Sequence, residues 1–319
     1  MNKENVLDEK YRPQTLDEVV GQSHIMPFFK GYAETKQIPH MMFSGPAGTG
    51  KTTVARALSR GIFGDDWKKN FRDFNASDAR KLTDIRGKVK DIAQTAPVKG
   101  GYKIIFMDEA DNLDWAAQPA LRRIIEDYSD ICRFILSCNY PNKIIEPIAD
   151  RLTEFRFRRL KTSDVTIMLG KIASKENINL TASGASVMAT LTNGSMRRAI
   201  KTLDAFKKAN MNDITEEMIY NKMFWVTDEH IKTLVIALRN KNYDDAHNQI
   251  NHLLYDRDYG HKEIFDSLIR VVKESQKLQT ATKLKILTKI GDTEFRISAG
   301  ASQDIQLKAL MAFIIRNIM

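Results

Sequence analysis

A glycine-rich segment with the sequence GPAGTGKTT occupies residues 45–53 and fits the phosphate-loop pattern G-x-x-x-x-G-K-[ST]. An apolar run precedes it and a helical pattern follows it, which is the context that such a loop requires. Backbone N–H groups of this loop surround phosphates, Lys51 adds a charge, and Thr52 offers a hydroxyl to Mg²⁺. The residues expected to contact a nucleotide are Pro46, Ala47, Gly48, Thr49, Gly50, Lys51, Thr52 and Thr53.

A second motif, IIFMDEAD, places acidic residues directly after an apolar run at residues 104–111. Ligands of parallel sheets bind at the carboxyl ends of the strands, where these side chains would lie. We expect Asp108 to hold Mg²⁺ and Glu109 to orient and deprotonate the attacking water. A solvated acidic turn is the alternative. Together with the phosphate loop, the motif predicts nucleotide hydrolysis rather than binding alone.

Two further polar residues follow apolar runs. Asn139 comes after FILSC, and its amide suits a hydrogen bond to the terminal phosphate or the water. Arg151 lies in IIEPIADRLTEF, and its guanidinium suits the charge that develops on a transferred phosphoryl group. From the local sequence alone, Asn139 is equally typical of a turn, and Arg151 of an ion pair with an acid such as Asp150.

These residues need a parallel sheet to bring them together. Between residues 40 and 160, apolar runs alternate with helical patterns, which predicts an α/β fold with five parallel strands and helices on both faces. The expected strands are residues 40–45, 71–77, 102–109, 132–139 and 154–160. Apolar residues at helical spacing predict a crossover helix through Leu82, Ile85, Val89 and Ile92. Pro119 indicates that the following helix begins or kinks near it.

The remainder of the chain shows helical periodicity. We expect a nucleotide-binding domain at 1–160, a small helical domain at 161–226 and an all-helical domain at 227–319. The final segment AFIIRNIM is apolar, which is consistent either with an oligomer interface or with packing inside its own domain. No apolar run approaches the length of a membrane span.

Composition favours an intracellular protein with an anionic partner. The 319 residues contain 49 Lys and Arg against 40 Asp and Glu, a formal charge of +9, so nucleic acid is a reasonable partner. The two cysteines, Cys132 and Cys138, have no metal-site or disulfide spacing, and we expect free thiols in a reducing compartment such as the cytoplasm. A merely basic surface is the alternative.

Several segments in order resemble one family. They are DEKYRPQTLDEVVGQ, GPAGTGKTT, FNASDARKLTDIRGKVKDIAQ, IIFMDEAD, PALRRIIEDYS, CRFILSCNYPNKIIEPI and GSMRRAI. Together they resemble the small subunit of replication factor C, the AAA+ sliding-clamp loader, in its archaeal form. The resemblance is dense from about residue 8 to 206 and weaker beyond. It implies an AAA+ module, a helical lid domain and a C-terminal collar domain that forms oligomers.

The resemblance also implies roles for individual residues. Asn139 matches sensor 1, Arg197 in GSMRRAI matches sensor 2, and Arg151 matches the arginine finger that acts on ATP in a neighbouring subunit. The segment that lines the adenine pocket in the family corresponds to Tyr11, Arg12, Pro13, Val19, Val20, Gly21 and Gln22. The family's Ser-Arg-Cys is Asp150-Arg151-Leu152 here, so we expect the adjacent carboxylate to compete for the finger.

The implied cofactors are ATP and Mg²⁺, and the implied partners are further copies, a larger subunit, a sliding clamp and primer-template DNA in a pentameric ring. Residues 77–90 supply an independent reason for DNA, because basic side chains flank a helix start there. The residues expected to contact the DNA backbone are Arg80, Lys81, Arg86 and Lys88. A solvated helix face is the alternative for them, and Arg122 and Arg123 are consistent with DNA or with a subunit interface.

We therefore expect an ATPase subunit of a clamp loader, stimulated by DNA and clamp together. Two alternatives stay open at this point. One is an AAA+ ring subunit of a DNA-remodelling motor that drives branch migration. The other is a regulatory subunit that binds ATP and hydrolyses it weakly, which the altered context of Arg151 favours.

Overall fold

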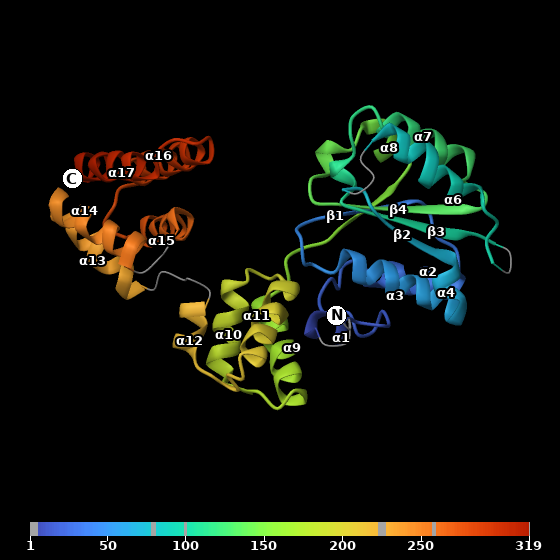
Figure 1. Cartoon of the computed structure of the whole chain (residues 1–319), viewed down its shortest axis with the longest axis horizontal. Helices are drawn as coiled ribbons and strands as arrows, with labels where there is room; N and C mark the ends of the chain where they lie inside the picture. Colours follow the sequence, from blue (N-terminus) through green and yellow to red (C-terminus); the bar gives the residue numbers. More distant parts are fainter. Residues whose placement is uncertain (1–5, 78–80, 99–100, 223–227, 257–259, 319) are drawn as a thin grey trace. The chain divides into compact units, whose positions relative to one another are not determined.

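The chain forms two compact units, Met1–Ile214 and Thr215–Met319. The computed structural model describes residues 6–77, 81–98, 101–222, 228–256 and 260–318 (Figure 1). Each unit has a hydrophobic core of its own. The predicted division into three domains at residues 160 and 226 stays a prediction.

The first unit is built on a five-stranded parallel sheet with the order β2-β3-β4-β1-β5. Its strands are β1 (Met41–Ser44), β2 (Phe71–Asn75), β3 (Lys103–Asp108), β4 (Cys132–Cys138) and β5 (Thr153–Arg156). Strand β1 lies between β4 and β5 and pairs through Met41 with Ile135 on one side and Thr153 on the other. The predicted five-stranded parallel sheet is therefore confirmed, although β5 ends at Arg156 rather than at residue 160.

Helices cover both faces of the sheet, as Figure 1 shows. The helices α2 (Met26–Thr35), α3 (Lys51–Phe63) and the short α4 (Trp67–Asn70) lie on one face, and α7 (Gln118–Asp127) and α8 (Glu146–Ala149) on the other. Every residue of β1 is buried, because both of its faces are covered, and such a strand has a continuous apolar sequence rather than an alternating one. Pro119 lies in the first turn of α7, which begins at Gln118, so the helix begins beside the proline.

The predicted crossover helix is a helical run with a wide turn in its middle. It consists of α5 (Leu82–Asp84), a π-helical turn (Ile85–Val89) and α6 (Lys90–Gln94). Ile85, Val89 and Ala93 are fully buried against the sheet. Their steps of four suit the wider i→i+5 turn, so Ala93 takes the core position that the helical spacing assigned to Ile92. Ile92 packs at the margin of the same core.

Three longer helices complete the first unit after the sheet. They are α9 (Thr162–Lys175), α10 (Ala182–Leu191) and α11 (Met196–Lys208), with a pair of two-residue strands, β6 (Asn179–Leu180) and β7 (Asp213–Ile214). The side chain of Thr181 caps α10, and that of Ser195 caps α11, by accepting backbone N–H groups. A short helix α1 (Leu7–Lys10) near the start of the chain contacts α11.

The second unit is helical in its described residues. Its helices are α12 (Glu216–Lys222), α13 (Asp228–Arg239), α14 (Tyr243–Asn251), a π-helical turn (His252–Asp256), α15 (His261–Glu274), α16 (Thr280–Ser298) and α17 (Gln303–Asn317). Ile314 of the apolar final segment and the preceding Met311 are buried in this unit's own core, together with Phe265 and Ile286. In the described ranges, no helix combines the length and apolar character of a membrane span.

Candidate nucleotide site

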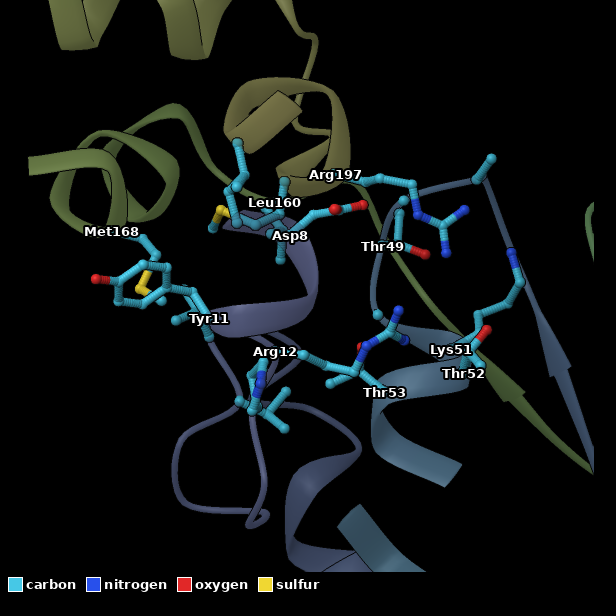
Figure 2. Close-up of a pocket in the computed structure, with 18 of the residues that line it drawn as sticks. Asp8, Tyr11, Arg12, Thr49, Lys51, Thr52, Thr53, Leu160, Met168 and Arg197 are labelled. Carbon is cyan, nitrogen blue, oxygen red and sulfur yellow. The ribbon is translucent and has the colours of Figure 1, made fainter. Parts of the chain in front are cut away.

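A pocket lies at the carboxyl edge of the sheet, and three parts of the first unit form its wall (Figure 2). The phosphate loop and the ends of β3 and β4 contribute Ala47, Gly48, Thr49, Gly50, Lys51, Thr52, Thr53, Asp108, Glu109 and Asn139. The N-terminal segment contributes Asp8, Tyr11, Arg12, Pro13, Val19 and Val20. The segment from the end of the sheet to α11 contributes Leu160, Met168, Met196, Arg197 and Ile200. Parallel strands explain this convergence, because their carboxyl ends meet at one edge.

The phosphate loop adopts a conformation that requires glycine. Gly48 has φ +79°, a region that side chains with a Cβ rarely adopt. A Cβ at Gly48 would also come within 2.2 Å of the Ser195 hydroxyl, and one at Gly45 within 2.2 Å of the Phe157 carbonyl oxygen. The loop therefore packs directly against both the end of β5 and the cap of α11.

Lys51 begins α3 and is buried, with 7% of its surface exposed. Its Nζ donates to the carbonyl oxygens of Gly45 (2.6 Å) and Pro46 (3.0 Å) and to Oδ1 of Asn139 (3.0 Å). Burial lowers the pKa of Lys51, while the nearby Asp108 carboxylate acts in the opposite direction. The lysine thus links the loop to the end of β4, where Asn139 was expected to contact a phosphate.

The acidic motif ends β3 with two carboxylates in different surroundings. Asp108 accepts hydrogen bonds from the hydroxyls of Thr52 (2.7 Å) and Ser137 (2.8 Å). A carboxylate beside a hydroxyl is the hard-oxygen donor set that Mg²⁺ prefers, so these residues fit the metal. Glu109 has φ +55°, and its Oε2 accepts hydrogen bonds from the side chains of Ser77 and Asn112.

Asp111, the last residue of the motif, has a role that the sequence did not indicate. Its side chain accepts the backbone N–H groups of Asn139 and Tyr140, each at 3.3 Å, and it is 7% exposed. These two bonds fix the backbone at the end of β4. The pattern placed an acid here, but only the position of β4 beside β3 reveals its partner.

The N-terminal segment forms the second wall and is only partly as expected. Tyr11, Arg12 and Val20 line the pocket, whereas Gly21 and Gln22 lie outside the lining. Gln22 supports the loop from behind, because its Nε2 donates to the carbonyl oxygens of Thr49 (3.3 Å) and Arg158 (2.6 Å). Pro46 also lies outside the lining. Asp8 is a lining residue that the sequence reasoning missed.

The third wall is apolar apart from Arg197. Leu160, Met168, Met196 and Ile200 line the pocket together with Arg197 at the start of α11. Sequence reasoning placed Arg197 here through the resemblance but missed the four apolar residues. Helical periodicity marks a buried face, and it does not distinguish a face buried by other helices from one that borders a pocket.

Arg151 does not line the pocket of its own chain. Its Nη2 forms an ion pair with Oε1 of Glu126 in α7 (2.5 Å), and its Nη1 donates to the Pro147 carbonyl oxygen (2.6 Å). We expected Asp150 to compete for this guanidinium, but Glu126 is the acid that pairs with it.

The structure describes three of the four residues expected to contact DNA, and all three are exposed. Arg80 lies outside the described residues. Lys81 is exposed immediately before α5, and Arg86 and Lys88 are exposed on the π-helical turn. Lys88 pairs with Asp84 at 3.4 Å, a contact one helical turn away that leaves its charge at the surface.

Comparisons with known proteins agree with this architecture. Residues 41–160 match the model of the ATPase family associated with various cellular activities (AAA), and residues 226–312 that of the replication factor C C-terminal domain. The chain is 44% identical to the replication factor C small subunit of Methanococcus maripaludis over 95% of this chain and 96% of the relative. The identity to that of Methanosarcina acetivorans is 41%, covering 97% of this chain and 95% of the relative.

A solved structure with a similar fold is the Thermotoga maritima RuvB Holliday junction branch migration motor. Its TM-score is 0.55 at 17% identity, over 81% of this chain and 85% of that one. At this identity the likeness concerns the fold alone. The much higher identity to the archaeal proteins extends over nearly the whole chain, and residues 41–160, which carry the phosphate loop and the acidic motif, match the AAA model. The chain therefore belongs to the replication factor C small-subunit family.

Proposed function

We propose that this chain is an ATPase subunit of a sliding-clamp loader, which uses ATP to open a ring clamp and load it onto primer-template DNA. The observation that carries the proposal is the convergence of Lys51, Thr52, Asp108, Glu109 and Arg197 on one pocket in a member of this family. These residues supply charge for phosphates, oxygen ligands for Mg²⁺ and a carboxylate for water.

Nucleotide binding is the first task of the pocket. The backbone of the phosphate loop and the ammonium of Lys51 bind the phosphates. Thr52 and Asp108 would hold Mg²⁺, which would neutralise charge on the outer phosphates. The base lies between the N-terminal wall at Tyr11 and Val20 and the apolar third wall. This arrangement fixes the nucleotide from three independent parts of the chain.

Hydrolysis needs a positioned water and stabilisation of the charge that develops on the transferred phosphoryl group. Glu109 orients the water and accepts its proton. Asn139, held by the Asp111 side chain through its backbone, presents its amide to the outer phosphate or the water. Arg197 reaches the phosphates from the start of α11, so that hydrolysis changes the contact between α11 and the loop.

Arg151 completes the site of a neighbouring subunit. The proposal rests on its absence from the lining of its own pocket and on its partly exposed guanidinium, whose side chain is 37% exposed. Its partner Glu126 is similarly exposed, so a phosphate can displace that carboxylate at modest cost. Unchanged ATPase activity of an assembled complex carrying Arg151→Ala would contradict this role.

DNA is bound through its backbone by Lys81, Arg86 and Lys88, with Arg80 assigned by sequence alone. Exposed basic side chains at a helix start suit phosphates and carry no base information. Such binding weakens steeply with salt. A salt dependence of DNA affinity that is the same for Arg86→Ala as for the unaltered chain would contradict the assignment.

The ATPase activity of the assembled loader tests the proposed function. We expect primed DNA and clamp together to stimulate steady-state hydrolysis, and Glu109→Gln to lower kcat by roughly 10²- to 10⁴-fold while ATP still binds. Asp114→Asn is the matched control, because Asp114 is an exposed acid in the next turn and does not line the pocket. Turnover that neither DNA nor clamp changes would favour a regulatory ATP-binding subunit instead.

A further inference from the structure

A buried carboxylate outside the pocket holds one of the pocket's walls. Glu176 follows the end of α9, and only 4% of its side chain is exposed. It accepts hydrogen bonds from the Tyr11 hydroxyl, from Nζ of Lys10 (2.6 Å) and from Nζ of Lys207. Tyr11 lines the pocket, whereas Glu176 does not. The contact between them joins residues 165 positions apart in the chain.

The groups around Glu176 keep its carboxylate ionised. Burial alone would raise the pKa of Glu176, but hydrogen bonds from Lys10, Lys207 and Tyr11 lower it to about 2. Burial and the hydrogen bond to Glu176 raise the pKa of Tyr11 to about 12. At neutral pH the pair is therefore a carboxylate and a protonated phenol. A buried charge of this kind is costly unless every partner stays in place.

The same carboxylate connects the parts that form two of the three walls. Lys10 and Tyr11 belong to the N-terminal segment, and Lys207 lies in the last turn of α11, the helix that begins with Met196 and Arg197. The helix α9, which Glu176 follows, contributes Met168. In Figure 2, Tyr11 and Met168 lie at the same end of the pocket, away from Lys51.

We propose that Glu176 is a positioning residue that fixes the Tyr11 ring against the nucleotide base and makes the N-terminal wall move together with α9 and α11. The inference rests on the proposed nucleotide site. A movement of α11 driven through Arg197 is then transmitted to Tyr11, so that both walls open and close on the base as one body. Two ammonium groups also lie over the Tyr11 ring, those of Lys10 at 5.5 Å and Lys175 at 5.9 Å from its centroid, but neither fixes the position of the hydroxyl.

Nucleotide affinity of the isolated chain, measured by titration calorimetry with Mg²⁺-ATP, tests the inference. Glu176→Gln keeps the shape but loses the charge, and we expect Kd to rise roughly tenfold, the scale of one charge-assisted hydrogen bond. Tyr11→Phe keeps the ring and loses the hydroxyl, and we expect a smaller rise. Because both variants break the same contact, the double variant should bind no more weakly than Glu176→Gln alone.

The matched control is Asp204→Asn. Asp204 is a buried acid in α11, it pairs with Lys208 at 2.6 Å, and it does not line the pocket. We expect Asp204→Asn to lower the stability of the chain but to leave Kd within about twofold of that of the unaltered chain, since local ion pairs act within their own helix. In the assembled loader, Glu176→Gln should raise KM for ATP far more than it changes kcat.

Four outcomes are decisive. Equal affinities of Glu176→Gln and the unaltered chain would overturn the inference, and so would additive effects of Glu176→Gln and Tyr11→Phe. If Glu176→Gln does not fold, an unchanged Kd for Tyr11→Phe overturns it in the same way. A lack of ATP binding by the unaltered chain would instead overturn the proposed nucleotide site itself.

Discussion

The ring of His40, the residue before β1, is hydrogen-bonded to the backbone of β4. Its Nδ1 accepts the backbone N–H of Phe134 at 3.0 Å, which requires the neutral ring. Burial and the charge of Arg133 lower the pKa of His40 to about 4. The unfolded chain, by contrast, binds this proton near the ordinary histidine pKa of about 6.5.

This difference predicts how stability changes with pH. Below pH 6.5 the unfolded state takes up the proton and the folded state does not, so the free energy of unfolding falls until pH reaches about 4. Between pH 7 and 4.5 we expect a loss of roughly 2 kcal/mol from this residue. The asparagine of His40→Asn retains an acceptor but does not titrate. The free energy of unfolding of this variant, measured by urea denaturation, should therefore fall by that much less over the same pH range. Parallel pH profiles of the two proteins would refute this.

At the residue scale, the sequence predicted the site residues that lie at the ends of strands. It did not predict the contacts between side chains that only the packing of helices brings together. Lys51, Asp108 and Asn139 follow strands, so a parallel sheet necessarily assembles them at one edge. The partner of Arg151 is Glu126, 25 positions away on α7, and no local pattern selects it over the adjacent Asp150. Buried partners such as these depend on how helices dock, which periodicity alone does not specify.

At the element scale, a buried lysine ends the crossover helix. Lys103 on β3 is 3% exposed, and its Nζ donates to the carbonyl oxygens of Ile92 and Thr95 and to the Thr95 hydroxyl (2.6 Å). Burial lowers the pKa of Lys103. The last carbonyl groups of a helix lack partners within it, and a cation there also interacts favourably with the helix dipole. One strand residue thereby fixes the end of the helix run that begins beside Lys81.

Replacing this lysine should destabilise the first unit. Lys103→Met keeps most of the volume but removes the charged donor to the carbonyl oxygens of Ile92 and Thr95, and we expect a loss of about 1 to 3 kcal/mol. Chemical denaturation of the isolated chain measures this. Lys90→Met, an exposed change in α6 itself, should stay within about 0.5 kcal/mol of the unaltered chain. A Lys103→Met protein as stable as the Lys90→Met protein would contradict the capping role.

The π-helical turn marks the limit of prediction at this scale. Strand positions were predictable within a few residues, because buried parallel strands have continuous apolar sequences. The helix between β2 and β3 was also predictable from its apolar spacing. Its wide turn was not, because steps of four between Ile85, Val89 and Ala93 are compatible with either an α-helix or a π-helix, and contact with the sheet selects between them.

At the scale of the whole molecule, the pocket belongs to the first unit. The residues that line the pocket lie between Asp8 and Ile200, all within the first unit. The second unit has its own buried core of residues such as Leu234, Ile250 and Leu310. A ligand stabilises only the structure whose folding creates its site, so ATP should act on one unit and leave the other unchanged.

Scanning calorimetry of the isolated chain should therefore show two transitions, of which Mg²⁺-ATP shifts one. At a ligand concentration one hundred times Kd, the stabilisation is about 2.7 kcal/mol, which raises Tm of a unit of this size by roughly 5 to 10 °C. Hydrogen exchange assigns the transition, because ATP should slow exchange in β1 and β3 and leave α15 and α16 unaffected. Lys51→Ala should abolish the shift. A single transition, or two that shift equally, would show that the units unfold together and that binding energy reaches the second unit.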